Sequence, residues 1–240
     1  MRIALVNESK AVSADEAMIM ARMLDLQMTR DFCPDWELGD TPVTYYQDKA
    51  SVPSGFDVMT IMDKCDDPNA LGYHTENGAR VTALIGVSPV LQAGGAVLWT
   101  PDPSIPTVLS VAAHEAMEMR GNPRVNAWVD GPEIPQGSQY CFEMCDAVES
   151  DSYEVVVDGH KGMTSSYLLQ DWFDVQKPSG GKYDKLGKLT AHFTLDANGY
   201  MIVRQGAGSE QQVFGRHYPA WRWHMKQHSA SRKSRITSQA

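Results

Sequence analysis

Apolar and polar residues follow one another in blocks that predict strands and helices in alternation. A β-branched apolar run at residues 2–7 predicts a buried strand. Met and Leu then recur at helical spacing, from a capping box formed by Ser13 and Glu16 to about Phe32, which predicts a long buried helix. Residues 41–46, 56–62 and 80–87 predict further strands, and residues 63–69 and 72–78 predict loops. The pattern is typical of an α+β fold with a mixed sheet.

A second helix, apolar and rich in alanine, is predicted in the middle of the chain. Pro106 suits a first helical turn, and Ser104 or Thr107 could provide the cap. Helix-breaking residues are absent until Gly121 and Pro123, which predict its end. The run is long enough for about four turns.

This central helix carries the motif His-Glu-x-x-Glu at residues 114–118. His114 and Glu118 are spaced i and i+4, so they project from one face, and Glu115 points about 100° away. The motif is a variant of the His-Glu-x-x-His helix of zinc peptidases, with a carboxylate in place of the second imidazole. Because the surrounding residues are apolar, we expect His114 and Glu118 to be buried and to need a partner such as a metal ion. Glu115 is then the candidate general base.

A second acidic stretch predicts the rest of the site. Glu143, Asp146 and Glu149 are spaced by three, which on a helix forms an acidic row. One interpretation is a solvated helix edge. The other is that Glu143 or Asp146 is the third metal ligand and a neighbouring carboxylate holds a ligand imidazole.

From residue 153 onward the chain is predicted to be rich in strands. Residues 154–158 predict a strand, residues 168–175 carry Trp172 and Phe173, and residues 188–195 and 200–204 predict a hairpin. Three polar residues outside the motif, His74, Tyr153 and His160, are candidates to stabilise an oxyanion, which makes His74 and Tyr153 candidate catalytic residues beside Glu115.

Charge and composition narrow the class of protein. The chain has 240 residues and a formal net charge of -9, which argues against a surface that binds nucleic acid throughout. Contact with nucleic acid is expected only through a basic tail at residues 221–240, predicted to be disordered, after one domain at residues 1–220. No apolar stretch is long enough for a membrane span or a signal peptide, so the expected location is the cytoplasm and no membrane partner is expected.

The small number of cysteines is consistent with the cytoplasm, a reducing compartment. Four cysteines are too few for a disulfide scaffold in a chain of 240 residues. Cys141 and Cys145 form a C-x3-C pair, for which a structural zinc is one interpretation and buried free thiols the other.

Several blocks of the chain carry a resemblance to a family. These blocks are residues 70–74, 110–119, 142–153, 171–174, 182–191 and 199–203. In them the chain resembles uncharacterised bacterial and phage proteins that look like minimal His-Glu-x-x-Glu metallopeptidases. The resemblance implies a zincin-like fold and a bound metal, and it implies no particular substrate. Two positions depart from it: Asn122 stands where the family tends to have Asp before Pro123, and His192 where it tends to have Pro. If that Asp is a ligand, this chain binds metal more weakly.

Two functions are therefore expected from the sequence. The first is a zinc-dependent hydrolase, most simply a peptidase acting on a peptide or protein, with His114 and Glu118 as Zn²⁺ ligands. The alternative is a phage structural or assembly protein that keeps the fold without turnover, with other phage structural proteins as partners and a location in the host cytoplasm or the virion.

Overall fold

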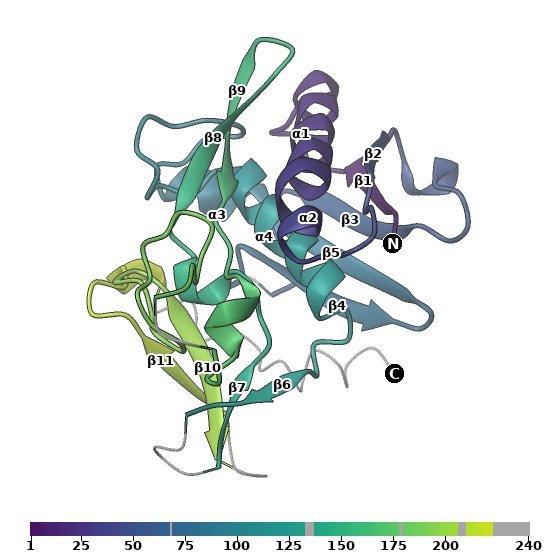
Figure 1. Cartoon of the computed structure of the whole chain (residues 1–240). Coiled ribbons are helices and arrows are strands. Elements are labelled where there is room, and N and C mark those ends of the chain that lie inside the picture. The colour runs from purple at the N-terminus through teal and green to yellow at the C-terminus, as the bar shows by residue number, and fades with distance from the viewer. Residues whose placement is uncertain (68, 133–136, 178–179, 206–209, 223–240) are drawn as a thin grey trace.

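The computed structural model describes residues 1–67, 69–132, 137–177, 180–205 and 210–222. It is an α+β structure in which a mixed sheet and two long helices precede smaller antiparallel sheets (Figure 1). The predicted fold class is confirmed at this level.

The larger sheet has five strands in the order β2-β1-β3-β5-β4. Its strands are β1 (Ile3–Asn7), β2 (Val43–Tyr46), β3 (Asp57–Met62), β4 (Gly72–Asn77) and β5 (Arg80–Gly86). Neighbours are parallel except β4, which is antiparallel to β5 at one edge. The first strand is buried on both faces because helices and the rest of the sheet cover it, as its continuous apolar run predicts.

The edge strand β4 covers residues for which a loop is predicted, so that prediction is wrong. Residues 72–78 were expected to form a loop, because their sequence lacks alternating apolar residues and ends in Asn-Gly. The structure pairs them with β5 from Gly72 opposite Ile85 to Asn77 opposite Arg80. Gly72 allows this strand to approach the central helix closely, since a Cβ atom there would lie 2.8 Å from Cγ1 of Val111.

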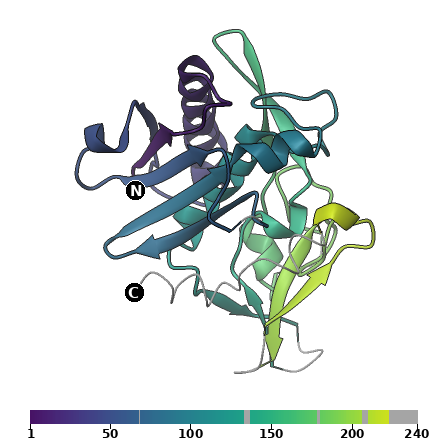
Figure 2. The ribbon, with the colours of Figure 1, turned by 180° about the vertical axis from the view of Figure 1, so that it is seen from behind.

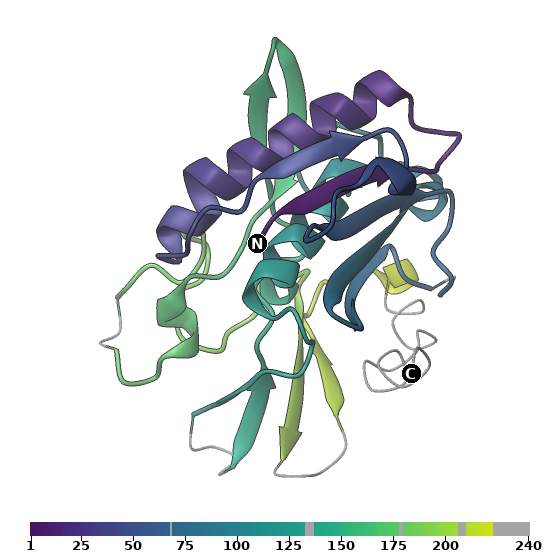
Figure 3. The same cartoon turned by 90° about the vertical axis from the view of Figure 1, so that its right-hand side faces the viewer.

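The N-terminal helix runs from Ala14 to Asp35 and crosses one face of the sheet (Figure 3). It consists of α1 (Ala14–Leu26), a π-helical segment η1 (Gln27–Phe32) and α2 (Cys33–Asp35). The predicted capping box is present, with the backbone N–H of Glu16 donating to Ser13 and that of Ser13 donating to Glu16. The helix extends three residues beyond the predicted end at Phe32.

The central helix α4 (Val108–Gly121) confirms the prediction for this segment. Thr107 caps it, since its hydroxyl accepts from the backbone N–H of Ser110 at 2.9 Å. The helix contacts β4 and β5 on one side and α1 and the β8–β9 hairpin on the other, so most of its surface is buried. A shorter helix, α3 (Val87–Gln92), precedes it.

The C-terminal half contains two antiparallel sheets. One has the order β11-β10-β7-β6, formed by β6 (Trp128–Asp130), β7 (Ser138–Cys141), β10 (Tyr200–Gln205) and β11 (Gln211–Phe214). The other is the hairpin of β8 (Ser152–Val157) and β9 (His160–Ser165). Seen from behind, β10 and β11 lie to one side of the larger sheet (Figure 2). The predicted β-rich C-terminal part is confirmed.

Two local predictions in this half were wrong. Residues 143–149 do not form a helix; they are irregular apart from the 3-10 turn η3 (Asp146–Val148). A second 3-10 turn, η4, covers Gln170–Phe173. Residues 188–195 form no strand, and β10 pairs with β7 and β11 instead. In each case tertiary packing outweighs the local pattern.

The predicted basic tail lies outside the described residues from position 223 onward. Its first part is described, and there Arg222 is buried and forms an ion pair with Glu149. In the part of the chain that the structure describes, no helix is long and apolar enough to cross a membrane.

Candidate metal centre

His114 and Glu118 face each other one turn apart on α4. Nε2 of His114 lies 3.2 Å from Oε1 of Glu118, and the two residues are 9% and 4% exposed. The same carboxylate oxygen accepts a hydrogen bond from the backbone N–H of Cys145 at 3.2 Å, which fixes its position. The burial and proximity expected from the i, i+4 spacing are therefore observed.

Asp146 joins this pair from another part of the chain. Its Oδ1 lies 3.3 Å from Nε2 of His114, where residues 142–146 pass the open face of α4. The hydroxyl of Tyr200, at the start of β10, donates to Asp146. Glu118 and Asp146 therefore both contact Nε2 of His114, from two segments of the chain.

Glu115 faces a different histidine. His74, on the edge strand β4, has its Nδ1 atom 3.1 Å from Oε2 of Glu115 and 3.8 Å from Oε2 of Glu118. Its other ring nitrogen, Nε2, donates to the backbone carbonyl of Asn122 at 3.0 Å. All three side chains are buried.

The five side chains form one continuous row in which acids and histidines alternate. The order is Asp146, His114, Glu118, His74 and Glu115. Buried carboxylates repel one another. In this row a proton or a metal ion can bind between them and compensate their negative charge.

The row shifts the pKa values of His114 and Glu115. Burial alone would lower the pKa of His114, but the charge of Glu118 and the hydrogen bonds of Asp146 and Glu118 raise it to about 10. Burial alone would raise the pKa of Glu115, yet the hydrogen bond to His74 and the charge of His114 lower it. Desolvation raises the pKa of the Cys145 thiol well above its ordinary value, so this thiol stays protonated.

The row opens into a cavity of about 680 Å³. The residues of the row line one wall, the segment 103–106 lines another, and β10 with residues 219–222 lines a third. Glu149 faces the cavity as well, but it is already bound, because Tyr218 donates to it at 2.6 Å and Arg222 forms an ion pair with it.

Glu143, the other candidate for third ligand, is buried and lines the same cavity, where it contacts Asn122. Its Oε1 atom is 3.5 Å from Nδ2 of Asn122 and 3.9 Å from Sγ of Cys141. Asn122 is a structural residue here, since it ends α4 and its Oδ1 accepts from the backbone N–H of Ala127 at 3.1 Å. The acidic triplet is therefore split: Asp146 contacts His114, Glu143 contacts Asn122, and Glu149 contacts Arg222.

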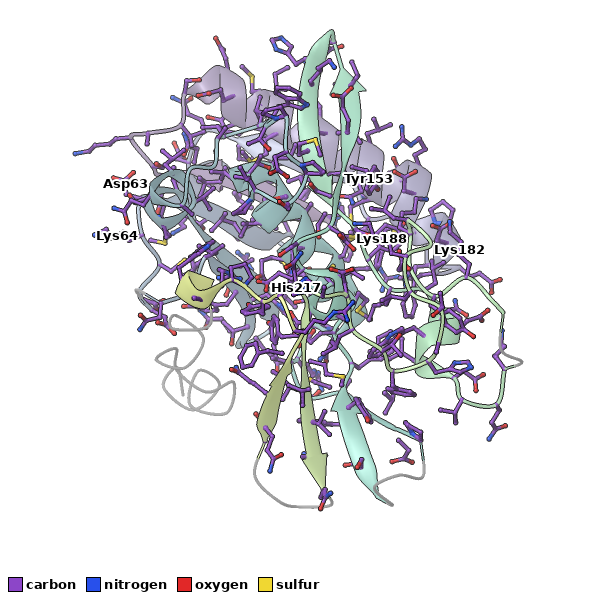
Figure 4. All side chains as sticks on the ribbon, turned by 90° about the vertical axis from the view of Figure 1, so that its left-hand side faces the viewer. Asp63, Lys64, Tyr153, Lys182, Lys188 and His217 are labelled. Atoms are coloured by element: carbon purple, nitrogen blue, oxygen red, sulfur yellow. The ribbon has the colours of Figure 1, made fainter. Side chains whose placement is uncertain are left out.

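The structure does not bring Tyr153 or His160 to this centre. The hydroxyl of Tyr153 donates to Asp31 at 2.9 Å and accepts from Gln27, beside the N-terminal helix (Figure 4). His160 is exposed at the tip of the β8–β9 hairpin. Both belong to other parts of the molecule, whereas His74 does line the cavity.

Two residues of the centre, Tyr200 and Arg222, were not predicted. Tyr200 belongs to a predicted strand, and a strand pattern does not show which neighbour a hydroxyl reaches. Arg222 falls in a segment predicted to be a disordered tail. In neither case does the local sequence carry a signal that could have identified the residue.

Two overlapping groups of buried side chains could hold a metal ion, His114 with Glu118 and Cys145, and His74 with Glu115 and Glu118. Within each group the potential ligand atoms lie within 4.8 Å of one another. Ligand atoms about 2.0–2.1 Å from a tetrahedral zinc ion are roughly 3.3 Å apart. The distances from Nε2 of His114 to Glu118 and Asp146, 3.2 Å and 3.3 Å, are of that size, although Asp146 is not a member of either group. The residues present therefore fit a divalent metal ion.

All four cysteines are buried and none forms a disulfide. No protein-family model, curated protein or solved structure matches the chain.

Proposed function

We propose that the protein is a zinc-dependent hydrolase, most simply a peptidase, with a zincin-like arrangement of sheet and helix. The observation that carries this proposal is the contact of Glu118 and Asp146 with the same atom, Nε2 of His114, in a buried site that opens to a cavity. We assign the three as the metal ligands. Asp146 is preferred to Glu143 because its Oδ1 atom lies 3.3 Å from the imidazole of His114.

A zinc ion held by these ligands would supply a bound water with a pKa near 7. Glu115 is the general base in this proposal, since it lies at the cavity wall beside the ligands and is not one of them. His74 orients its carboxylate from one side, and Gly72 leaves room for it on the other, because a Cβ at position 72 would lie 3.3 Å from Cγ of Glu115. Tyr200 holds Asp146 in its ligand position.

A peptide is the favoured substrate because of the edge strand. β4 is the last strand of its sheet among the described residues, so no described strand pairs with its outer edge, and residues 69–74 line the cavity. An extended peptide could pair with this edge and pass its backbone across the metal centre. The backbone pairing would bind many sequences, and the acidic cavity walls would favour substrates with basic groups.

Elemental analysis of the protein purified without added metal tests whether the protein binds zinc. We expect about one zinc per chain, lost in His114→Ala. Hydrolysis of an unstructured peptide library by the zinc-loaded protein tests whether it is a peptidase. A folded protein that binds no zinc on titration would contradict the proposal and favour the alternative of a virion structural or assembly protein.

A further inference from the structure

A second group of potential metal ligands lies directly beside the first. His74, Glu115 and Glu118 come from β4 and α4, and all three are buried. Their potential ligand atoms lie within 4.8 Å of one another, and Nδ1 of His74 is 3.1 Å from Oε2 of Glu115. An imidazole between two carboxylates is a donor set suited to Zn²⁺ or Mn²⁺.

The two groups share Glu118, and its two oxygens face different histidines. Oε1 lies 3.2 Å from Nε2 of His114, and Oε2 lies 3.8 Å from Nδ1 of His74. This is the geometry of a carboxylate that bridges two cations. In two-metal sites the ions are typically about 3.5–4 Å apart, a separation that one bridging carboxylate can span.

The ring of His74 is held as metal-binding imidazoles usually are. Nε2–H donates to the carbonyl of Asn122 at 3.0 Å, so Nδ1 is left to face the two carboxylates. Glu115 is held as firmly, because β4 approaches α4 closely at Gly72. Neither residue needs a large movement to bind an ion.

We propose that His74, Glu115 and Glu118 form a second divalent-cation site that shares Glu118 with the first and binds Zn²⁺ or Mn²⁺ more weakly. It is the weaker site because its ligand atoms are less evenly spaced: Nδ1 of His74 lies 3.1 Å from Glu115 and 3.8 Å from Glu118, against 3.2 Å and 3.3 Å around Nε2 of His114. An ion bound there engages the carboxylate of Glu115, so excess metal withdraws the proposed general base and inhibits hydrolysis. This last step rests on the proposed function, whereas the site itself does not.

The number of bound ions tests the site without reference to activity. Native mass spectrometry and calorimetric titration of the full chain with ZnCl₂ should show a tight first equivalent and a second that binds at least about 100-fold more weakly. A wild-type protein that stops at one equivalent at millimolar zinc would overturn the second site and leave the first intact. A protein that binds no zinc would refute both, so the two failures are distinguishable.

Two variants locate the second ion. Glu115→Gln and His74→Leu should each keep the first equivalent and weaken the second at least about 100-fold, and Glu115→Gln keeps the shape of the side chain if His74→Leu does not fold. His160→Ala removes an exposed histidine and is the matched control, with both equivalents retained. If the second equivalent survives in Glu115→Gln and disappears in His160→Ala, it is bound at the surface and the proposal is wrong.

The shared carboxylate gives a further readout. With Mn²⁺ as the probe, two ions bridged by Glu118 should give the electron paramagnetic resonance spectrum of a coupled pair at two equivalents. Two independent single-ion spectra would show that the ions do not share Glu118 and would overturn the bridged arrangement.

Discussion

Oδ1 of Asp146 lies 3.3 Å from Nε2 of His114, although the two residues belong to different elements of the fold. The contact exists because the segment before η3 passes the open face of α4, where the backbone N–H of Cys145 also donates to Glu118. This relationship distinguishes Asp146 from the other two acids of the stretch, and it has direct consequences for metal affinity.

We expect Asp146→Asn to weaken the first zinc site far more than Glu143→Gln or Glu149→Gln. Asp146 contacts His114, whereas Glu143 contacts Asn122 and Glu149 contacts Arg222. Loss of a ligand should cost at least about 100-fold in affinity, and loss of a more distant partner less. Competition with a chromogenic zinc chelator measures all three variants. Equal affinities would show that none of the three acids binds the ion.

Tyr200→Phe should weaken zinc binding by about 10-fold, because the hydroxyl of Tyr200 donates to Asp146 and orients it. Tyr218→Phe is the matched control, since it removes a similar hydrogen bond in the same region, from Tyr218 to Glu149 at 2.6 Å. A larger effect of Tyr218→Phe on zinc affinity would contradict the role given to Tyr200.

The sequence predicted the part of the centre that lies on one helix. Thr107, the apolar run and Gly121 define α4, and the spacing of His114 and Glu118 then follows from helical geometry. The same reasoning misplaced the acidic triplet, because spacing by three indicates a shared face only on a helix, and residues 143–149 are not one. Asp146 reaches His114 through tertiary packing.

The contact between His74 and Glu115 could not be predicted for a related reason. Residues 72–78 have the composition of a turn, and they form a strand because β5 offers them backbone partners and Gly72 lets them approach α4. A short edge strand depends on its neighbours more than on its own residues. Tyr153, a candidate to stabilise an oxyanion, donates to Asp31 beside the N-terminal helix, a contact that the sequence pattern does not indicate.

Tyr153→Phe should destabilise the fold and leave zinc affinity unchanged. Its hydroxyl donates to Asp31 and accepts from Gln27, so its loss should reduce the free energy of unfolding by about 1 kcal/mol. Urea denaturation and zinc titration on the same preparation measure both effects. A loss of turnover of about 100-fold in a normally folded Tyr153→Phe protein would instead restore a catalytic role to this residue.

The contacts of Asp31 should make the free energy of unfolding decrease at acidic pH. Burial alone would raise the pKa of Asp31, but hydrogen bonds from Arg30 and Tyr153 and the charge of Lys185 lower it below its ordinary value of 3.8. Asp31 therefore binds a proton more readily in the unfolded chain than in the folded protein. Its ionised carboxylate stabilises the folded protein fully above about pH 4, and this stabilisation is lost as the pH falls through the lower pKa of the folded state. The stability difference between wild type and Asp31→Asn should be constant from pH 7 to about 4.5 and shrink below about pH 3.5. A difference that grows on acidification would contradict this sign.

Glu115→Gln separates catalysis from metal binding. Glu115 lies next to His114 in the sequence but faces His74, so it lines the cavity beside the first zinc site without being one of its ligands. The amide keeps the shape of the side chain and cannot take a proton, so turnover should fall by roughly 100-fold or more. The first equivalent of zinc and the melting temperature should change little, whereas His114→Ala should lose both zinc and stability, because metal binding energy contributes to folding. Turnover, zinc content and melting temperature of both variants show whether Glu115 is the general base, a zinc ligand or neither. If Glu115→Gln loses the first zinc, Glu115 is a ligand of that site; if it keeps the full rate, the proton is taken by another group.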